Sequence, residues 1–467
     1  MKRIKNIISA TAAVVALVAA AFVLASCDDK LDIVPKGKVT LATAEELELM
    51  LNQEYMIQMM PCNDAEILSG ESLGFYDNVH AVLAQTNTLK YAYMTFDESV
   101  GRAMLTSNDE RYNSIYRYIN YMNVVIEKSA SAKGDKRLIE QISAEAKVMR
   151  AYMHWLAVCY YAQQYDGATA ASVSGVPYVT NTKVTEKKVC LNLADTYAHI
   201  LADVADDIIE ALPLKSDAPA IRGDRAWGYA VRAVVLMQMK RYSEALPYAK
   251  KAIELHPQMF DRSVVKATGS WEQRQDSENN FIFIGHGPKI SPTMVMVPAD
   301  VMAMFEDGDY VLKYDSPGWD KNQGESMSGI EGTCIYYGWG TMLNVYGLTS
   351  ELLHYVAAEC LIRTGKAQQG LDLVNDVREK RVENCKPFTA DNEAEAMALL
   401  QKAKYVECIG STFNFIDIKR WNTEPAYKRT IVRRLKGIGT YRLAPESKLW
   451  VFPFPSNATR YNDTLKN

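Results

Sequence analysis

The sequence lacks the residue patterns on which most metal, nucleotide and hydrolase sites depend. Its eight cysteines form no CxxC pair, and its six histidines are scattered without an HExxH motif. Zinc sites need ligands at such spacings. The chain also has no GxSxG elbow, no phosphate-binding P-loop and no GxGxxG turn between a strand and a helix. We therefore predict neither a metal site nor a cofactor.

The chain has no excess of positive charge. Lysine and arginine number 52 against 56 aspartates and glutamates, so the formal net charge is −4. Proteins that bind nucleic acid usually carry a basic surface, and we therefore expect no nucleic-acid partner. A hydrophobic content of 48% and a charged content of 23% are typical of folded rather than disordered chains. With 467 residues, the chain can form one large domain or a few smaller ones.

A long uncharged run lies near the N-terminus. Met1–Lys5 is positively charged, and the apolar run that follows ends at Leu24. This order is typical of a secretory signal peptide, although the run is also long enough to span a bilayer. Leu24-Ala-Ser-Cys27 resembles the lipoprotein box of bacteria, in which the cysteine is acylated and becomes the first residue of the mature chain. We therefore predict a signal peptide at 1–26 and lipidation of Cys27, with an uncleaved membrane anchor as the alternative.

Three aspartates, Asp28, Asp29 and Asp32, follow this cysteine closely. In some Gram-negative bacteria, an aspartate next to the lipidated cysteine signals retention in the inner membrane. An acidic stretch at this place also resembles the surface-export signal of Bacteroidota lipoproteins, so the aspartates alone leave both locations open. Residues 27–42 are predicted to be an acylated N-terminus and an extended tether.

Amphipathic helices dominate the chain from Thr43 onward. Thr43-Ala-Glu-Glu46 has the form of a capping box, in which a threonine and a glutamate three residues later begin a helix. Apolar residues then recur at helical spacing. The segments predicted as helices on this basis are 111–129, 139–165 and 192–212. We therefore predict a mostly α fold.

Two later segments resemble each other. Asp224–Pro257 and Ser350–Arg381 align at an offset of 125 residues, and small or short apolar side chains fall at the same places. The matched positions are Ala233, Ala245 and Ala252 in the first segment and Ala358, Gly370 and Val377 in the second. The pattern resembles the tetratricopeptide repeat, a helix pair that stacks on its neighbours because one pair cannot bury its own face. We predict a tetratricopeptide-like helical-repeat scaffold, with a plain helical bundle as the alternative.

The stretch between the repeats has a different composition. Residues 260–349 are rich in glycine, proline and aromatic residues, and Gly318–Gly340 holds six glycines in 23 residues. This composition predicts an irregular, loop-rich insertion, and loops on a rigid scaffold often carry function. We therefore expect an N-terminal helical part at 43–259, the insertion at 260–349 as the ligand side, and a C-terminal part at 350–467.

Several motifs in a fixed order resemble those of the SusD/RagB family of outer-membrane lipoproteins. The stretches that carry the resemblance are AEAKVMRAYMHWLAVCYYAQQYDG at 144–167, TYAHILADVADDIIEALP at 196–213, LHYVAAECLIRTGKAQQGLDLVNDVREKR at 353–381, VECIGSTFNFIDIKRW at 406–421 and LWVFPFP at 449–455. Each motif alone is unspecific. Together, in this order and after a lipoprotein box, they cover nearly the whole mature chain.

The resemblance implies a SusD-like α-α superhelix and a binding protein rather than an enzyme. It implies a cell-surface location in Bacteroidota, with anchoring in the outer membrane through the acyl chains. The ligand would be a nutrient, most often a glycan or oligosaccharide, delivered to a SusC-type TonB-dependent transporter. RagB-type relatives take peptides, so a peptide is the alternative ligand. Two further alternatives are a lipid-anchored glycosidase using Glu407 and Asp417, and a scaffold without a small ligand.

Aromatic side chains are the candidate ligand contacts. Sugar rings can stack on flat aromatic faces, which cost little conformational entropy to order. The candidates are Trp319, Tyr336, Tyr337 and Trp339 in the insertion and Tyr91, Tyr93 and Phe96 in an earlier loop, where the resembled family often places ligand contacts. Ordinary packing in the core is an equally good explanation for each of them. As a set, we expect at least two to be exposed around one groove.

Overall fold

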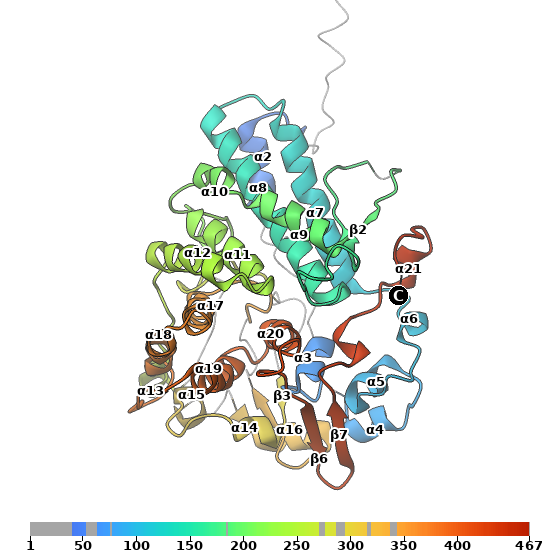
Figure 1. Cartoon of the computed structure of the whole chain (residues 1–467), viewed down its shortest axis with the longest axis vertical. Coiled ribbons are helices and arrows are strands. Elements are labelled where there is room, and N and C mark those ends of the chain that lie inside the picture. Colours follow the sequence, from blue (N-terminus) through green and yellow to red (C-terminus); the bar gives the residue numbers. More distant parts are fainter. Residues whose placement is uncertain are drawn as a thin grey trace, which may run out of the picture.

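The computed structural model describes residues 40–52, 63–74, 77–183, 185–269, 276–285, 295–314, 319–336 and 343–466. The predicted signal peptide, Cys27 and most of the tether lie outside these residues. Helices make up most of the described elements, which confirms the prediction of a mostly α fold. In Figure 1 the N-terminal helices lie at the top and the helical repeats at the left, while the insertion and a C-terminal hairpin lie at the bottom.

Two long helices that pack along each other form the centre of the N-terminal part. The elements of this part are α2 (Ala44–Leu51), α7 (Glu110–Ser129), α8 (Lys136–Tyr161), α9 (Leu193–Asp203) and α10 (Asp206–Ala211), with a small antiparallel sheet of β1 (Ser174–Pro177) and β2 (Cys190–Asn192). Both α7 and α8 bury apolar residues such as Ile119 and Val148 in the main core. Half of the predicted capping box is present: the Thr43 hydroxyl accepts a hydrogen bond from the Glu46 amide at 3.3 Å and begins α2, but the Glu46 carboxylate accepts one from the Ala42 amide, at 2.6 Å, instead of the Thr43 amide.

The single helix predicted at 192–212 is two helices in the structure, separated at Val204 and Ala205. The side chain of Asp203, at the end of α9, accepts hydrogen bonds at 2.7 and 2.8 Å from the buried guanidinium of Arg150. The Val204 carbonyl accepts a hydrogen bond from Arg232 at 2.6 Å. In a continuous helix this carbonyl would bond an amide of the next turn. Tertiary contacts to arginine side chains therefore replace helical hydrogen bonds at the break.

The two predicted repeats are helix pairs that stack on each other. They consist of α11 (Arg225–Gln238) with α12 (Tyr242–Leu255) and of α17 (Ser350–Ile362) with α18 (Ala367–Glu379), and α12 packs against α17. Gly370 shows why small residues recur at the matched positions. A Cβ atom at Gly370 would lie 2.6 Å from the Ala358 carbonyl oxygen, so α17 and α18 could not approach this closely with a larger residue there.

The C-terminal part ends by returning to the N-terminal helices. Its elements are α19 (Glu393–Glu407), α20 (Phe413–Trp421), a hairpin of β6 (Ile431–Leu435) and β7 (Gly439–Leu443), the 3₁₀ turn η3 (Lys448–Trp450) and α21 (Ser456–Thr459). After the hairpin, the Phe452 amide donates a hydrogen bond to the Tyr160 carbonyl at 2.9 Å, and the Ser456 amide donates one to the Thr106 carbonyl at 2.9 Å. The end of the chain thus lies against the end of α8.

The insertion contains more regular structure than its composition predicts. Its elements are η2 (Arg262–Val264), α13 (Val265–Thr268), β3 (Val295–Val297), α14 (Ala299–Met302), α15 (Tyr310–Tyr314), β4 (Trp319–Asp320), α16 (Lys321–Ser328) and β5 (Cys334–Tyr336). The three strands form an antiparallel sheet in the order β3-β5-β4. The apolar run at 281–284, which has a strand-like composition, is buried and pairs through an isolated bridge between Ile282 and Ala220.

Four short helices connect the N-terminal part to this sheet. They are α3 (Asn63–Ser69), α4 (Val79–Leu83), α5 (Leu89–Thr95) and α6 (Arg102–Leu105). Leu73 donates a backbone hydrogen bond to Met296 of β3 at 2.8 Å. Val82 of α4 and Met94 of α5 pack with Ile335 of β5 in a second, smaller core. The early segment and the insertion, far apart in sequence, are therefore neighbours.

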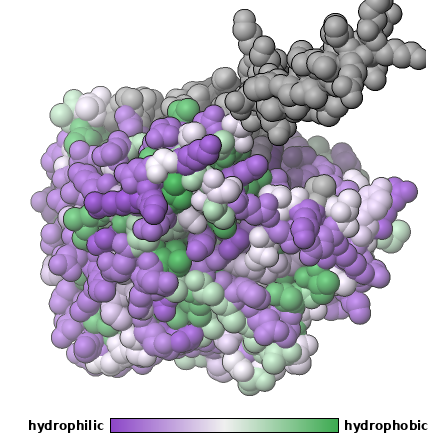
Figure 2. Space-filling view, turned by 90° about the horizontal axis from the view of Figure 1, so that it is seen from above, coloured by the Kyte–Doolittle hydropathy of each residue, from purple (hydrophilic) through white to green (hydrophobic). Residues whose placement is uncertain are grey.

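The surface shown in Figure 2 is mostly hydrophilic, with hydrophobic residues in small groups between polar ones, as on ordinary solvent-exposed surfaces. Within the part of the chain that the structure describes, no helix combines the length and the apolar character needed to cross a bilayer.

Candidate ligand-binding cleft

A cleft of about 600 Å³ opens between α3, α5, the beginning of α7 and the returning C-terminal segment. Its volume is in the range of small-molecule binding sites, roughly 300–1,000 Å³. The side chains that line it are both apolar and polar: Asn63, Asp64, Ile67, Leu73, Gly74, Asp77, Val82, Leu89, Lys90, Tyr93, Met94, Thr106, Asn108, Asp109, Glu110, Arg111, Phe452 and Pro453. We call this the Arg111 cleft.

Arg111 is the buried cation of this cleft, with 3% of its surface exposed. Its guanidinium donates hydrogen bonds to both carboxylate oxygens of Asp64, at 2.7 and 3.2 Å, and lies 3.5 Å from Asp109. It stacks over the rings of Tyr160 and Phe452, 4.0 and 4.3 Å from their centroids. Burial alone would lower the pKa of Arg111, but the carboxylates nearby outweigh burial and hold that pKa above its ordinary value.

Asp109 is placed by its role at the start of α7. As the N-cap residue, its side chain accepts hydrogen bonds from the backbone amides of Arg111 and Tyr112 at 2.9 and 3.2 Å. The Tyr161 hydroxyl donates a further hydrogen bond to it at 2.6 Å. N-cap aspartates satisfy helix amides that would otherwise lack a partner. The same carboxylate therefore begins the helix and fixes one side of the cleft.

Arg433 of β6 holds the two helices that form the opposite wall. Its guanidinium, 4% exposed, donates hydrogen bonds to the carbonyls of Tyr93 and Met94 in α5, at 2.9 and 2.5 Å, and to the carbonyl of Ile67 in α3. Helix C-terminal carbonyls carry partial negative charge, which favours a cation there. Burial lowers the pKa of Arg433 to about 9. A C-terminal strand thus positions side chains of an early segment of the chain.

Of the three early aromatic candidates, the structure places Tyr93 in the cleft lining. Tyr93 packs against Phe452 with ring centroids 5.8 Å apart and is 5% exposed. Phe96 is 7% exposed and lies under the Arg433 guanidinium, 4.2 Å from its ring centroid, so it has a structural contact instead. Tyr91 is half-buried and outside the lining, and the segment predicted as a loop is helix α5, which carries both Tyr91 and Tyr93. The role of each in ligand binding stays a prediction.

Trp319 and Tyr336 are brought together on the small sheet of the insertion. They are opposite each other in β4 and β5, with ring centroids 4.4 Å apart, and both contact the ring of Phe305. Side chains alternate between the two faces of a strand. Because Ile335 faces α4 and α5, its neighbour Tyr336 points away from them and is fully buried. These aromatic residues therefore form a separate cluster and do not line the Arg111 cleft.

The remaining candidates, Tyr337 and Trp339, lie outside the described residues. Sequence reasoning missed Arg111, Asp64, Asp109 and Phe452, which belong to the lining of the cleft. One signal was available, because Phe452 belongs to the closing LWVFPFP motif. No sequence signal indicated the pairing of Asp64 with Arg111, because the two residues lie on different helices and a local pattern covers only one helix at a time.

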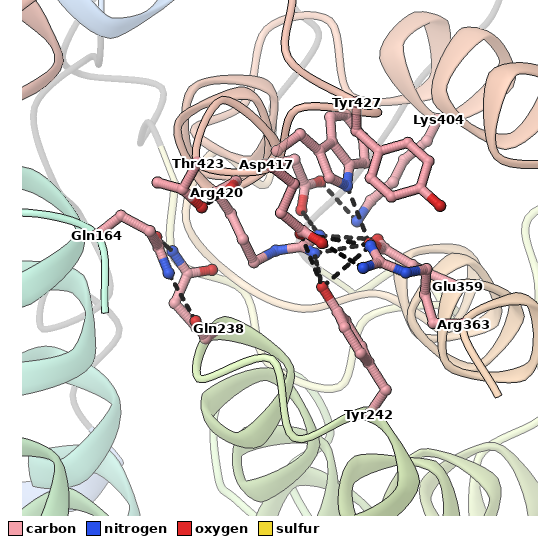
Figure 3. A network of polar contacts seen from close by, with 12 residues as sticks. Gln164, Gln238, Tyr242, Glu359, Arg363, Lys404, Asp417, Arg420, Thr423 and Tyr427 are labelled. Atoms are coloured by element: carbon pink, nitrogen blue, oxygen red, sulfur yellow. Dashed lines mark hydrogen bonds and ion pairs between the residues drawn. The ribbon is translucent and has the colours of Figure 1, made fainter. Parts of the chain in front are cut away.

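A second group of charged residues is closed to solvent (Figure 3). Arg420 donates hydrogen bonds to both carboxylate oxygens of Glu359 at 2.6 and 2.7 Å and to Asp417 at 2.9 Å. Lys404 pairs with Asp417 at 2.6 Å, and the Trp421 indole donates to Glu359 at 2.9 Å. The side chains of the four charged residues are at most 4% exposed. We call Arg420, Lys404, Glu359 and Asp417 the Arg420 network.

The positions of Glu407 and Asp417 do not support the glycosidase alternative. Asp417 is enclosed in the Arg420 network, and Glu407 accepts hydrogen bonds from Arg381, both at 2.8 Å, and from Arg262 at 3.3 Å. Burial would raise the pKa of Glu407, but the two arginines outweigh burial and hold it below its ordinary value. A glycosidase needs a carboxyl group with a raised pKa as its acid. Neither residue lines the Arg111 cleft.

Comparison with known proteins identifies the architecture. Residues 36–236 match a family model, SusD-like, described as starch-binding and associating with the outer membrane. These residues belong to the SusD-like family. No curated protein sequence matches the chain. The matched residues make up less than half of the chain, so the prediction that the chain is not an enzyme stays a prediction.

Solved SusD-like structures share the fold of nearly the whole chain. A SusD-like carbohydrate-binding protein from Bacteroides vulgatus is similar with a TM-score of 0.69 and 15% identity, covering 91% of this chain and 97% of that one. A SusD superfamily protein from Bacteroides thetaiotaomicron is similar with a TM-score of 0.66 and 14% identity, covering 91% of this chain and 99% of that one. A putative sugar-binding protein from Bacteroides vulgatus is similar with a TM-score of 0.64 and 13% identity, covering 92% of this chain and 99% of that one. The predicted SusD-like α-α superhelix is confirmed.

Proposed function

We propose that this protein is a surface lipoprotein that binds a glycan or oligosaccharide in the Arg111 cleft and delivers it, unchanged, to a SusC-type TonB-dependent transporter. The binding role is supported by the cleft itself, because its volume and its mixed polar and apolar lining suit an oligosaccharide. Membership of residues 36–236 in a starch-binding, outer-membrane-associated family supports the ligand class and the location.

The lining offers what a saccharide needs. Asp64, Asn108 and Asp109 provide groups that exchange hydrogen bonds with hydroxyls, while the rings of Tyr93 and Phe452, 5% and 2% exposed, pack against each other within the wall.

Calorimetric titration of the purified protein with a panel of soluble glycans and peptides tests the binding role. We expect saturable binding of at least one glycan and roughly three- to tenfold weaker binding by Asn108→Ala, because a hydrogen-bonding amide at the cleft is lost. Gln369→Ala is the matched control, since it removes an exposed amide on α18, outside the lining. Binding of peptides and of no glycan would make this a peptide-binding protein of the same fold.

The anchor and the partner need separate tests in cells. Metabolic labelling with palmitate is expected to mark the wild-type protein and to leave Cys27→Ala unlabelled. Affinity purification from solubilised outer membranes is expected to recover a TonB-dependent barrel with the wild-type protein. Label on the Cys27→Ala protein contradicts lipidation at Cys27, and recovery of no outer-membrane barrel contradicts the transporter partnership.

A further inference from the structure

The charges around the Arg111 cleft are unequal in sign. Among the residues that the structure describes, four carboxylates (Asp64, Asp77, Asp109 and Glu110) and two cations (Lys90 and Arg111) line it. Four negative and two positive charges leave the lining with a net charge of −2. The whole sequence is nearly balanced, with 56 acidic and 52 basic residues, so this excess is concentrated locally.

Both cations of the lining are already engaged by carboxylates. Arg111 is held by Asp64 and Asp109, and Lys90 pairs with Asp77 at 2.6 Å. An acidic ligand group would have to displace a carboxylate from one of them, and the displaced carboxylate would remain in the same cleft. Like charges that share a confined, partly desolvated space repel each other more strongly than they do in bulk water.

The carboxylates, in contrast, can still accept hydrogen bonds from a ligand. The side chain of Asp64 is 32% exposed and that of Asp77 is 39% exposed, so their oxygens reach the cleft. A carboxylate offers about four lone-pair positions, and hydroxyl or ammonium donors can occupy those that the cations leave open. Sugar hydroxyls and the ammonium groups of amino sugars are donors of this kind.

We propose that the cleft selects neutral or amino-bearing saccharides and discriminates against acidic ones, such as uronate- or sulfate-bearing chains. This inference rests on the proposed function, because it assigns a ligand class to the cleft that the function requires. The selectivity comes from the excess of carboxylates and from the engagement of Lys90 and Arg111 within the lining.

Binding of chitosan, chitin, starch and xylan oligosaccharides, homogalacturonan oligosaccharides and heparin oligosaccharides to the purified protein tests the proposal. We expect every bound probe to be neutral or amino-bearing. Preferred binding of homogalacturonan or heparin would overturn the charge selectivity and leave glycan binding intact. If no probe of any charge binds, the assignment of the cleft to saccharides fails, and the proposed function fails with it.

A matched pair of variants separates the local charge from the net charge of the protein. Asp77→Asn removes a carboxylate from the cleft and frees Lys90, whereas Asp300→Asn removes one outside the lining and frees Arg434 from an equal 2.6 Å ion pair. We expect Asp77→Asn to weaken chitosan binding by roughly two- to fivefold, and less at high salt. Asp300→Asn should not change it. Equal effects of both variants, or none of Asp77→Asn, would overturn the proposal.

Discussion

The Arg420 network and the Arg111 cleft are built from the same three groups, a buried arginine with two carboxylates. Around Arg420 the carboxylate side chains, Glu359 and Asp417, are 0% and 4% exposed. Around Arg111 the corresponding side chains, Asp64 and Asp109, are 32% and 14% exposed. The first arrangement is closed and its charges balance once Lys404 is included. The second is open on one side and has surplus carboxylates, so it can exchange hydrogen bonds with a ligand.

The strongest test of this comparison is Glu359→Gln, which leaves Arg420 buried with a weakened partner. Removing one member of a buried ion pair typically costs about 3–5 kcal/mol of unfolding free energy. Denaturant unfolding should show a loss of this size. Glu446→Gln, which removes an exposed partner of Lys428, is the control and should leave the unfolding free energy nearly unchanged. A similar, small effect of both substitutions would mean that the network does not stabilise the fold.

Acid should weaken the Arg420 network through Glu359. Burial raises the pKa of Glu359, but Arg420, Lys404 and Trp421 outweigh burial and lower it to about 2 from an ordinary value of 4.5. The folded protein therefore holds this carboxylate ionised more tightly than the unfolded chain does. Its contribution, about 3 kcal/mol, is fully present above pH 4.5 and is lost as the pH falls from 4.5 towards 2. Unfolding free energies measured across this range should fall less steeply in Glu359→Gln than in the wild type.

A smaller effect is expected for Arg111→Met. The free energy of unfolding should fall by about 1–3 kcal/mol, because the hydrogen bonds to Asp64 are lost while water can reach the freed carboxylate. Ligand affinity should fall as well, since the methionine holds neither wall carboxylate in place. Arg117→Met is the control, because it lies on the exposed face of the same helix. A loss as large as that of Glu359→Gln would contradict the description of the cleft as open.

The smallest effect is expected for Asp77→Asn. The Lys90–Asp77 pair is exposed, with 66% and 39% of its side chains accessible, and such pairs contribute about 0–1 kcal/mol. The unfolding free energy should therefore change little, although the ligand preference changes. A large loss of stability here would indicate that this carboxylate serves the fold and not only the cleft.

The sequence predicted what depends on local spacing and missed what depends on contacts between distant segments. Helical periodicity placed α7, and the matched small residues placed the stacked repeats, since both signals lie within short stretches. Aromatic identity did not distinguish Tyr93 at the cleft from Phe96 beneath Arg433, because that difference depends on a strand more than 300 residues away. Asp64 and Arg111 lie on two different helices, so no local pattern indicated that they would meet.

The return of the C-terminal segment also determines when the cleft can form. Phe452 bonds the end of α8, and Phe452 and Pro453 complete a lining whose other described members lie between residues 63 and 111. Contacts of such high sequence separation form late, because a long loop must close first. During synthesis, the repeats can stack while the binding site is still missing one side. The residues that close the cleft therefore come from the last part of the chain to be made, and a protein cut after Leu443 would lose α21 and the buried Phe452 as well as one side of the cleft.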